Sequence, residues 1–271
     1  MTFVQTLLLA IIQGITELFP VSSVAHAVLT PFIFHWNLPP EFLKTHFLPF
    51  VVMLHLGTAA ALIVYFWRDW CDFAASLVDS RAQIQRQVLL RVIVGTIPAV
   101  IIGFALEKPL TRLFASAISA AIFLIVNGVM LYLGERVRRG TKGIEHIGYI
   151  DALLVGCAQS LALVPGFSRS GASMIAGFWV GLSHVESARF SMLLATPIIL
   201  GASVLEIPKL LHGGIGDMFV TALFGGVIAG VVAFLSVWAL MTWFRRQEFN
   251  AMLPFAVYCW LLGAAVLAFS L

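Results

Sequence analysis

Charged residues are scarce in this chain: Asp, Glu, Lys and Arg together make up only 11% of its 271 residues. Hydrophobic residues make up 61%, and the mean hydropathy is +1.00. Apolar runs recur along the whole length, so no long stretch has the composition of a soluble domain. The composition therefore excludes an ordinary soluble protein and predicts a single membrane domain that covers residues 1–271.

Cysteine is also rare. The chain has three scattered cysteines, with no CxxC pair and no metal-ligand spacing: Cys71, Cys157 and Cys259. This pattern argues against a disulfide framework or a zinc site and suggests small apolar packing residues. The sequence also lacks a Walker loop, a dinucleotide-binding fingerprint and a basic stripe. We therefore expect no nucleic-acid partner.

Basic residues are missing from the N-terminal region, where Lys44 is the first. A secretory signal opens with a cationic segment, and this sequence shows none. We therefore expect the first apolar segment to remain part of the mature protein.

Six apolar segments are long enough to cross a bilayer, whose hydrocarbon core needs roughly 20 residues of helix. They are residues 47–67, 88–107, 114–133, 188–206, 217–241 and 251–271. The sequence therefore predicts six transmembrane helices.

Two further apolar regions, residues 1–34 and 149–182, are interrupted near the middle by polar and helix-breaking residues. The interruptions read ELFPVSS in the first region and LVPGFSRSG in the second. Non-helical backbone at membrane depth is stable only where protein or a watery cavity satisfies its hydrogen bonds. Each region is therefore predicted to form a re-entrant hairpin of two short helices, which enters and leaves on the same side.

The order of one hairpin and three spans occurs twice, which predicts an internal repeat. Pro20 aligns with Pro165 in the two interruptions, and Met53 aligns with Met192 in the spans that follow. Because each half has an odd number of full spans, the second half is inverted relative to the first. Inverted repeats place their interrupted helices face to face near the membrane middle, so the two interruptions can share one site.

The predicted fold class is an all-α polytopic membrane protein with two inverted-topology repeats, each a re-entrant helical hairpin plus three transmembrane helices. The first repeat covers residues 1–134 and the second covers residues 149–271, with a cytoplasmic linker at residues 135–148. Transporters also use inverted repeats with broken helices, so the architecture alone does not decide the function.

Basic residues predict which side of this bundle faces the cytoplasm. With the predicted topology, eleven lie on one side: Arg68, Arg81, Arg86, Arg91, Arg136, Arg138, Arg139, Lys142, Arg189, Arg245 and Arg246. Four lie on the other side: Lys44, Lys108, Arg112 and Lys209. The positive-inside rule makes the first side cytoplasmic. Both termini and the opening of the site are then predicted to lie outside, at the level of the lipid headgroups.

Polar side chains gather at the first interruption. Gln13 and Glu17 are four residues apart and share one face of the first short helix. A carboxylate is costly inside a membrane, so it normally faces a bundle interior or a cavity and marks function. The alternative is a protonated glutamate that forms a hydrogen bond for helix packing.

Two serines and a histidine follow the helix-breaking proline. Ser22 or Ser23 is suited to cap the next helix, but capping explains only one of them. His26 lies three and four positions further on and is expected on the same helix face. We therefore take all three as candidate site residues, with packing as the alternative for His26. His55, inside a predicted span, is assigned to packing.

The second interruption has the features of a phosphate site. Ser168, Arg169 and Ser170 stand where a helix is expected to begin. A helix N-terminus presents free N–H groups and a partial positive charge, and arginine adds a fork of donors that fits phosphate oxygens. An ion pair between Arg169 and Glu17 is the structural alternative. Both are compatible, because a substrate phosphate can displace the carboxylate.

The motif QGITELFPVSS, followed by AH, together with PGFSRSGAS, resembles the two signature regions of the bacterial undecaprenyl-diphosphate phosphatases of the bacitracin-resistance type. Members of that family typically carry E/Q-x-x-x-E leading into P-V-S-S-x-x-H, and P-G-x-S-R-S. The resemblance covers the whole chain in length and segment order. The first motif position is Gln13 and not Glu, which weakens any scheme with two carboxylates on a metal. The chain also has Ala25 where the family usually has glycine before the histidine, and Ser173 where a threonine is common.

The resemblance implies removal of the terminal phosphate from undecaprenyl diphosphate, which regenerates the carrier lipid for cell-wall glycan synthesis and gives bacitracin resistance. It also implies a multi-pass protein of the bacterial inner membrane, a polyprenyl diphosphate lipid as substrate and a divalent cation, Mg²⁺ or Ca²⁺, as cofactor. Transferred to this chain, it implies catalytic roles for Glu17, Ser23, His26 and Arg169, phosphate binding by Ser22, Ser168, Arg169 and Ser170, and metal binding by Glu17 and Gln13.

The sequence leaves several alternatives open. Either Ser23 or His26 can be the nucleophile, or His26 can activate water. A lipid-phosphate flippase or secondary transporter would use the same pocket, but translocation has no evident need for a cluster of serine, histidine and glutamate. Whether two chains form a homodimer is also left open.

Overall fold

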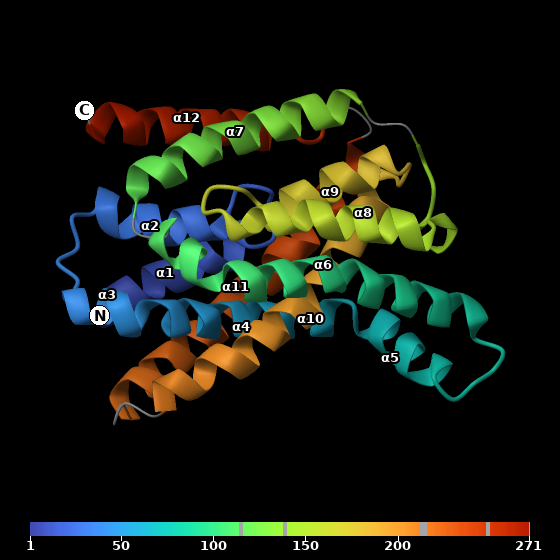
Figure 1. Cartoon of the computed structure of the whole chain (residues 1–271), viewed down its shortest axis with the longest axis horizontal. Helices are drawn as coiled ribbons and strands as arrows, with labels where there is room; N and C mark the ends of the chain where they lie inside the picture. Colours follow the sequence, from blue (N-terminus) through green and yellow to red (C-terminus); the bar gives the residue numbers. More distant parts are fainter. Residues whose placement is uncertain (114–115, 138–139, 212–215, 248–249, 271) are drawn as a thin grey trace.

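The computed structural model describes the chain except for residues 114–115, 138–139, 212–215, 248–249 and 271 (Figure 1). The described part is almost entirely helical. In chain order the elements are α1 (Phe3–Thr16), α2 (Ser23–Ile33), α3 (Pro40–Thr45), α4 (Phe47–Tyr65), α5 (Trp67–Ser76), α6 (Gln83–Leu113), α7 (Ala117–Arg136), the 3₁₀ turn η1 (Ile144–His146), α8 (Tyr149–Gln159), the 3₁₀ turn η2 (Ser160–Leu163), α9 (Arg169–Trp179), α10 (His184–Leu211), α11 (Gly216–Arg246) and α12 (Leu253–Ser270).

Six helices in the described part are long and apolar enough to cross a membrane: α4, α6, α7, α10, α11 and α12. This confirms the prediction of a polytopic helical membrane protein. Three of these helices, α6, α10 and α11, extend beyond the predicted apolar segments at both ends, whereas α4 and α12 are slightly shorter than predicted. For example, α6 begins at Gln83 and not at residue 88, because polar residues continue the helix beyond the hydrocarbon core.

The two interrupted regions each form short helices, as predicted. The first break separates α1 from α2 and contains Pro20, and the second separates η2 from α9 and contains Pro165. Proline lacks the N–H that would continue a helix, so both breaks lie where the sequence indicated. Each break therefore brings non-helical backbone into the interior of the bundle.

Helix α5 was not predicted from the sequence, because its amphipathic pattern is too polar for a span. Phe73 and Ser76 on its inner face are buried, whereas Trp67 is exposed. The guanidinium of Arg86 donates to the Ser76 carbonyl from Nε at 2.8 Å and from Nη2 at 2.5 Å. This contact satisfies the C-terminal end of α5 and ties it to α6.

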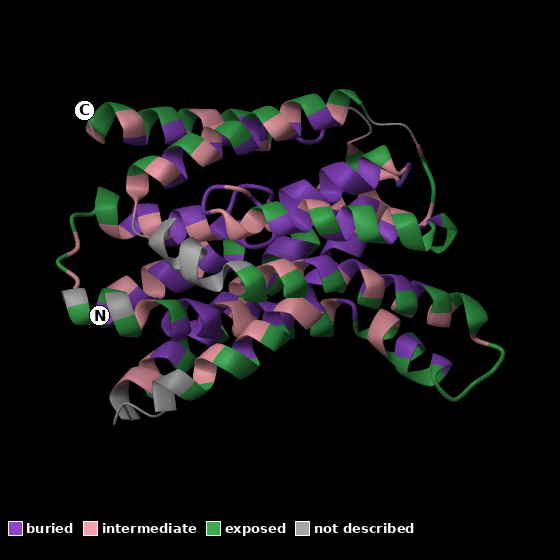
Figure 2. Cartoon of the chain, in the orientation of Figure 1, coloured by how far each residue is buried: buried purple, intermediate pink, exposed green. Residues whose placement is uncertain are grey.

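Helix α4 runs through the lower half of Figure 1 and packs against α10 and α11. Around it, α1 packs on α11 and α8 packs on α6, while α7 and α12 form a pair at the top of Figure 1. Buried residues concentrate where the hairpins meet the central helices (Figure 2).

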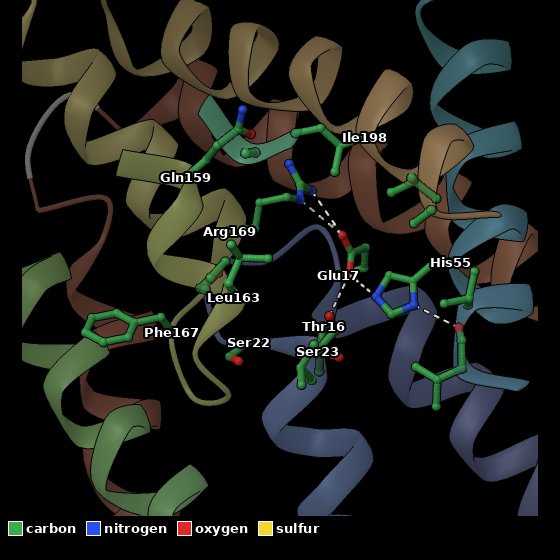
Figure 3. A pocket seen from close by; sticks show the side chains of 18 of the residues that line it. Thr16, Glu17, Ser22, Ser23, His55, Gln159, Leu163, Phe167, Arg169 and Ile198 are labelled. Atoms are coloured by element: carbon green, nitrogen blue, oxygen red, sulfur yellow. Dashed lines mark hydrogen bonds and ion pairs between the residues drawn. The ribbon is translucent and has the colours of Figure 1, made fainter. Parts of the chain in front are cut away.

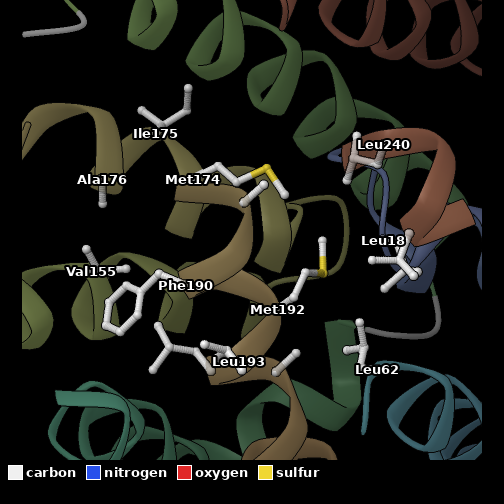
Figure 4. Close-up of a cluster of buried hydrophobic side chains, with 14 of the residues drawn as sticks. Leu18, Leu62, Val155, Met174, Ile175, Ala176, Phe190, Met192, Leu193 and Leu240 are labelled. Atoms are coloured by element: carbon white, nitrogen blue, oxygen red, sulfur yellow. The ribbon is translucent and has the colours of Figure 1, made fainter. Parts of the chain in front are cut away.

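One large apolar cluster joins the first break to the helices of the second half. Leu18 of the break packs in the same cluster as Met174 of α9, Met192 of α10 and Leu240 of α11 (Figure 4). All four side chains are at most 2% exposed. This cluster fixes the positions of both breaks, because close-packed interiors leave side chains little room to shift.

The contact between α4 and α11 depends on glycine. A Cβ atom added to Gly57 would collide with the carbonyl group of Gly226 on α11. Small residues allow helices to approach closely in a membrane, where packing replaces the hydrophobic effect as the driving force.

We therefore expect Gly57→Ala to lower the free energy of unfolding by about 1–3 kcal/mol, the usual cost of overpacking a core. Thermal unfolding of the purified protein in detergent would show a lower midpoint. The matched control is Gly201→Ala on α10, where an added Cβ meets no atom within 4 Å. A Gly57→Ala protein as stable as the Gly201→Ala protein would contradict the predicted packing.

Candidate active site

The break between α1 and α2 places two serines beside a carboxylate. Helix α1 ends with Glu17 as its C-cap, and the Ser22 Oγ atom accepts the Ala25 N–H at 3.3 Å and so caps α2. Ser22 has a φ of 66°, a conformation that non-glycine residues rarely adopt. Such a backbone costs on the order of 1–3 kcal/mol and often occurs at functional sites. The strained turn directs Ser23 back toward Glu17.

The break before α9 forms the helix start that the sequence predicted. Gly166 has a φ of 111°, which only glycine adopts readily, and it lets the chain turn after Pro165. The Ser168 Oγ atom accepts the Gly171 N–H at 3.1 Å and caps α9. Arg169 is therefore the first residue of α9, at the positive end of the helix dipole.

Asn127 of α7, which was not among the predicted site residues, joins the two breaks. Its Nδ2 atom donates to the Pro20 carbonyl at 3.0 Å, and its Oδ1 atom accepts the Ser168 N–H at 3.0 Å. Ser170 adds a second link, because its hydroxyl donates to the Phe19 carbonyl at 3.2 Å. Asn127 is fully buried, and its signal in the sequence is a lone amide inside an apolar span.

A pocket of about 270 Å³ lies beside these breaks (Figure 3). Its polar lining consists of Thr16, Glu17, Ser22, Ser23, His55, Gln159, Ser168 and Arg169. Its apolar lining consists of Val24, Leu48, Val51, Val52, Ala99, Ala162, Leu163, Phe167, Ile198, Ile199 and Ala202. The pocket thus combines a polar cluster with walls of aliphatic and aromatic side chains.

Glu17 is at the centre of the polar cluster, and its side chain is only 6% exposed. Its Oε1 atom accepts from Arg169 Nη2 at 3.1 Å and from Arg169 Nε at 3.3 Å. Its Oε2 atom accepts from Ser23 Oγ at 2.5 Å and from Gln13 Nε2 at 3.2 Å, and His55 Nε2 lies 3.1 Å from the same oxygen. The predicted pair of Glu17 and Arg169 is therefore present, and it carries one charge of each sign.

His55 belongs to this cluster, so assigning it only to helix packing was wrong. Its Nδ1 atom lies 2.8 Å from the Val51 carbonyl oxygen of its own helix, which turns Nε2 toward Glu17 (Figure 3). Helix α4 is apolar on all sides, so periodicity could not indicate which face His55 occupies. The available signal was a titratable side chain inside a transmembrane span.

The structure does not bring His26 to the pocket. Its Nδ1 atom lies 2.7 Å from the Ser22 carbonyl oxygen, and its Nε2 atom lies 2.7 Å from the Tyr258 hydroxyl of α12. The expectation that His26 shares a face with Ser22 and Ser23 assumed helical spacing from Ser22 onward. That spacing holds between Ser23 and His26 in α2, but the His26 ring is bonded to the Ser22 carbonyl and to Tyr258 and does not line the pocket. A catalytic role for His26 stays a prediction.

Gln13 and Ser170 are buried next to the pocket but do not line it. The Gln13 amide donates to Glu17, and the Ser170 hydroxyl bonds to Phe19 and Ser168. Gln13 therefore holds the Glu17 carboxylate in place, and Ser170 connects the start of α9 to the first break.

The pocket has too few side-chain ligands to coordinate a metal ion without other molecules. The residues that the structure describes contain no group of three or more His, Cys, Asp or Glu side chains that could hold one. Glu17 is the only Asp or Glu in the described lining, and Arg169 already pairs with it. These residues fit a divalent cation only if other ligands, such as phosphate oxygens and water, complete its shell.

The fold and the pocket together define a class of protein. A serine hydroxyl that donates to a carboxylate is the arrangement of an activated nucleophile, and an arginine at a helix N-terminus is suited to bind an anion. The polar cluster around Glu17 lies next to apolar walls in a membrane-embedded helical protein. This arrangement is suited to an enzyme that acts on an amphipathic, anionic molecule.

Comparison with known proteins gives the family. The sequence pattern of the family "Bacitracin resistance protein BacA" matches residues 6–265, so the chain belongs to this family. It is 52% identical to "Undecaprenyl-diphosphatase 2" of Oenococcus oeni, over 99% of this chain and 98% of that protein. It is 50% identical to "Undecaprenyl-diphosphatase" of Acidiphilium cryptum, over 97% of this chain and 96% of that protein. A third relative, "Undecaprenyl-diphosphatase 2" of Chromobacterium violaceum, is 45% identical over the full length of both chains.

Proposed function

We propose that this protein hydrolyses undecaprenyl diphosphate to undecaprenyl phosphate and inorganic phosphate. The single observation that carries the proposal is the contact of Ser23 Oγ with Glu17 Oε2 at 2.5 Å, beside Arg169 and inside an amphipathic pocket. The names of the relatives, undecaprenyl-diphosphatases at 52% and 50% identity, support the same substrate. The reaction regenerates a carrier lipid for cell-wall synthesis and provides resistance to bacitracin.

The pocket suits both parts of the substrate. Leu48, Leu163, Phe167 and Ile198 are among the apolar residues that would surround the first isoprene units of the prenyl chain. The diphosphate would lie at the polar end, where Arg169 can form two charge-assisted hydrogen bonds with phosphate oxygens. Binding of the diphosphate would displace Glu17 from Arg169, so the ion pair holds the pocket in shape until substrate arrives.

The geometry favours a two-step mechanism with Ser23 as nucleophile. In the first step Ser23 Oγ attacks the terminal phosphorus, its proton passes to Glu17 Oε2, and the phosphoanhydride bond breaks to release undecaprenyl phosphate. In the second step water attacks the phosphorus of the phosphoserine and the bond to Ser23 Oγ breaks. Glu17 returns its proton to Ser23 Oγ, and both protons of the water leave on the released inorganic phosphate. Arg169 and the N-terminus of α9, capped by Ser168, stabilise the charge on the transferred phosphoryl oxygens in both steps.

His26 is less suited to attack the phosphorus, because both of its ring nitrogens already have partners outside the pocket. We therefore assign the nucleophile to Ser23. Trapping of the covalent intermediate should then give phosphoserine and no phosphohistidine.

A divalent cation, Mg²⁺ or Ca²⁺, is proposed to bind together with the substrate. Glu17, and the amide oxygen of Gln13 if its side chain turns, would hold the ion from the protein side. Such an ion would neutralise charge on the diphosphate oxygens. Because Gln13 carries no charge, the protein supplies one carboxylate and not two.

Release of inorganic phosphate from undecaprenyl diphosphate by the purified protein in detergent tests the function. Hydrolysis needs no second compartment, whereas the competing flippase or transporter activity does. A pure, folded protein that releases no phosphate, with Mg²⁺ or Ca²⁺ present, would rule out the phosphatase and favour transport. The serine held on the carboxylate favours the phosphatase.

We also propose that the two halves are inverted-topology repeats, covering residues 1–134 and 149–271. Contacts of equivalent helices support this: α1 packs on α11, the second full span of the other half, and α8 packs on α6, the second full span of the first half. Both contacts use a glycine, since a Cβ on Gly14 would meet Ala229 and a Cβ on Gly156 would meet Gly95. In this arrangement both hairpins are re-entrant.

We propose that the cytoplasmic side of the protein is the side on which most basic residues lie at the ends of the helices. The end of α4, the start of α6 and the end of α7 lie toward the right of Figure 1, whereas α1 begins and α12 ends at the left. Leu48 near the start of α4 and Ala202 in the second half of α10 line the pocket, which supports an opening away from the basic side. Arg138 and Arg139 lie outside the described residues, as do the side chains of Lys44, Lys108, Arg112 and Lys209.

This orientation predicts that Cys71, exposed on α5, is cytoplasmic. In spheroplasts an impermeant thiol reagent should label it only after the membrane is permeabilised. The control is an Asn37→Cys protein in a Cys71→Ser background, since Asn37 is exposed between α2 and α3 and should react from outside. Labelling of Cys71 in intact spheroplasts would reverse the proposed orientation.

Membrane lipids are expected to cover the outward-facing apolar side chains of the α7 and α12 pair. Leu133 is 53% exposed on α7, and Leu261 is 67% exposed on α12. A homodimer through this or another face stays a prediction of the sequence.

A further inference from the structure

A chain of hydrogen bonds runs from α12 to the turn that carries Ser23. The Tyr258 hydroxyl lies 2.7 Å from His26 Nε2, and His26 Nδ1 lies 2.7 Å from the Ser22 carbonyl oxygen. The rings of Tyr258 and His26 also stack, with centroids 5.7 Å apart and planes inclined by 7°. The mechanism above uses neither residue.

The partners of His26 define which ring nitrogen carries hydrogen. A carbonyl oxygen can only accept, so Nδ1 carries the hydrogen and donates it to Ser22. The lone pair of Nε2 then accepts the hydrogen of the Tyr258 hydroxyl. A neutral His26 therefore satisfies both of its ring nitrogens with these two partners, in an environment where its exposed fraction is only 7%.

The carbonyl group that His26 holds belongs to the strained residue of the site. Ser22 has φ 66° and ψ 94°, and such a conformation persists only where the surroundings enforce it. Its carbonyl is bonded to a buried ring, and the next residue is Ser23, whose hydroxyl lies 2.5 Å from Glu17. The ring of His26 thus holds the peptide group that aims the nucleophile.

We propose that Tyr258 is a positioning residue for Ser23, acting through His26 on the Ser22 backbone. The proposal rests on the proposed function, because it concerns the reactivity of Ser23. In this arrangement His26 is a neutral link and not an acid or base. It also gives α12, which otherwise packs mainly on α7, an influence on the catalytic turn.

Tyr258→Phe tests the proposal by removing one oxygen atom while keeping the stacked ring. We expect kcat to fall about three- to tenfold with little change in KM, the effect of losing one neutral hydrogen bond that positions the nucleophile. The matched control is Tyr132→Phe on α7, whose ring packs on Trp260 of α12 with centroids 5.6 Å apart. That variant should keep the kcat of the unmodified protein.

A double-mutant cycle separates positioning from general packing. His26→Asn keeps a donor near the Nδ1 position and removes the acceptor for Tyr258. In that background Tyr258→Phe should cause no further loss of kcat, because the link is already cut. If the losses of kcat from the two substitutions multiplied in the double variant, the proposal would be wrong. It would also be wrong if Tyr258→Phe lowered the thermal stability but left kcat per folded molecule unchanged.

Nitrogen NMR of the substrate-free protein with ¹⁵N-labelled histidine gives a readout that does not need activity. The signal absent from the His26→Asn spectrum should show a protonated Nδ1 and an unprotonated Nε2, and Tyr258→Phe should shift the Nε2 resonance. The opposite tautomer, or a doubly protonated ring at neutral pH, would overturn the proposal even if a variant folds poorly. A wild-type protein that releases no phosphate would instead disprove the proposed function. The spectra would then still test whether His26 links Tyr258 to the Ser22 carbonyl.

Discussion

Ser23→Ala is expected to abolish nearly all phosphatase activity, with kcat reduced roughly 10³-fold or more. The substitution removes the oxygen that lies 2.5 Å from Glu17 and leaves the helix cap intact, because the cap is the hydroxyl of Ser22. Alanine also suits the first position of a helix, so the fold should persist. Phosphate release from undecaprenyl diphosphate measures the loss, and trapping should find no phosphoserine.

The matched control for this prediction is Ser236→Ala. Ser236 is also a buried serine, and its hydroxyl bonds to the Val232 carbonyl of its own helix at 2.8 Å, outside the pocket lining. That variant should retain full activity. If Ser23→Ala kept more than about a tenth of the wild-type kcat, water or His26 would have to replace Ser23 as the attacking group.

Glu17→Gln should have the second largest effect, a loss of roughly 10²- to 10⁴-fold in kcat, as expected for removal of a general base. The amide keeps the shape of the side chain but cannot take the proton of Ser23. It also leaves Arg169 without its counter-ion in a buried site, which is destabilising. The measurement is therefore activity per folded molecule, with the unfolding midpoint recorded in the same detergent.

The control for Glu17→Gln is Glu41→Gln on α3, an exposed carboxylate outside the pocket. It should change neither activity nor stability. A Glu17→Gln protein that folds and retains wild-type kcat would show that the carboxylate only pairs with Arg169. The base would then have to be another group, and His55 is the nearest candidate in the pocket.

The sequence predicts those parts of this protein that depend on local chemistry. Proline and glycine interrupt the apolar regions, so both breaks, the helix start at Arg169 and the pairing of Arg169 with Glu17 could be predicted. The six spans follow from the length of their apolar runs.

The sequence does not predict which way a side chain faces inside an apolar span. His55 and Asn127 lie in helices that are apolar on all sides, so no periodic pattern assigns their faces. The direction of the His26 ring depends on its partners, the Ser22 carbonyl and the Tyr258 hydroxyl of α12. These three positions are set by contacts between helices that are far apart in the sequence.

The hydrogen bonds that join the two breaks form late in biosynthesis, because they connect residues that are far apart in the sequence. Arg169 follows Glu17 by 152 residues, so at about 5–20 residues per second the ribosome needs roughly 8–30 seconds to supply the arginine after the glutamate. Asn127 binds Pro20 and Ser168 and therefore completes its bonds only when the second break has arrived. During biosynthesis the first hairpin must therefore wait in the membrane or its insertion machinery while Glu17 lacks its arginine partner. Assembly of the site is thus a late event, and a truncated nascent chain carries no working pocket into the lipid.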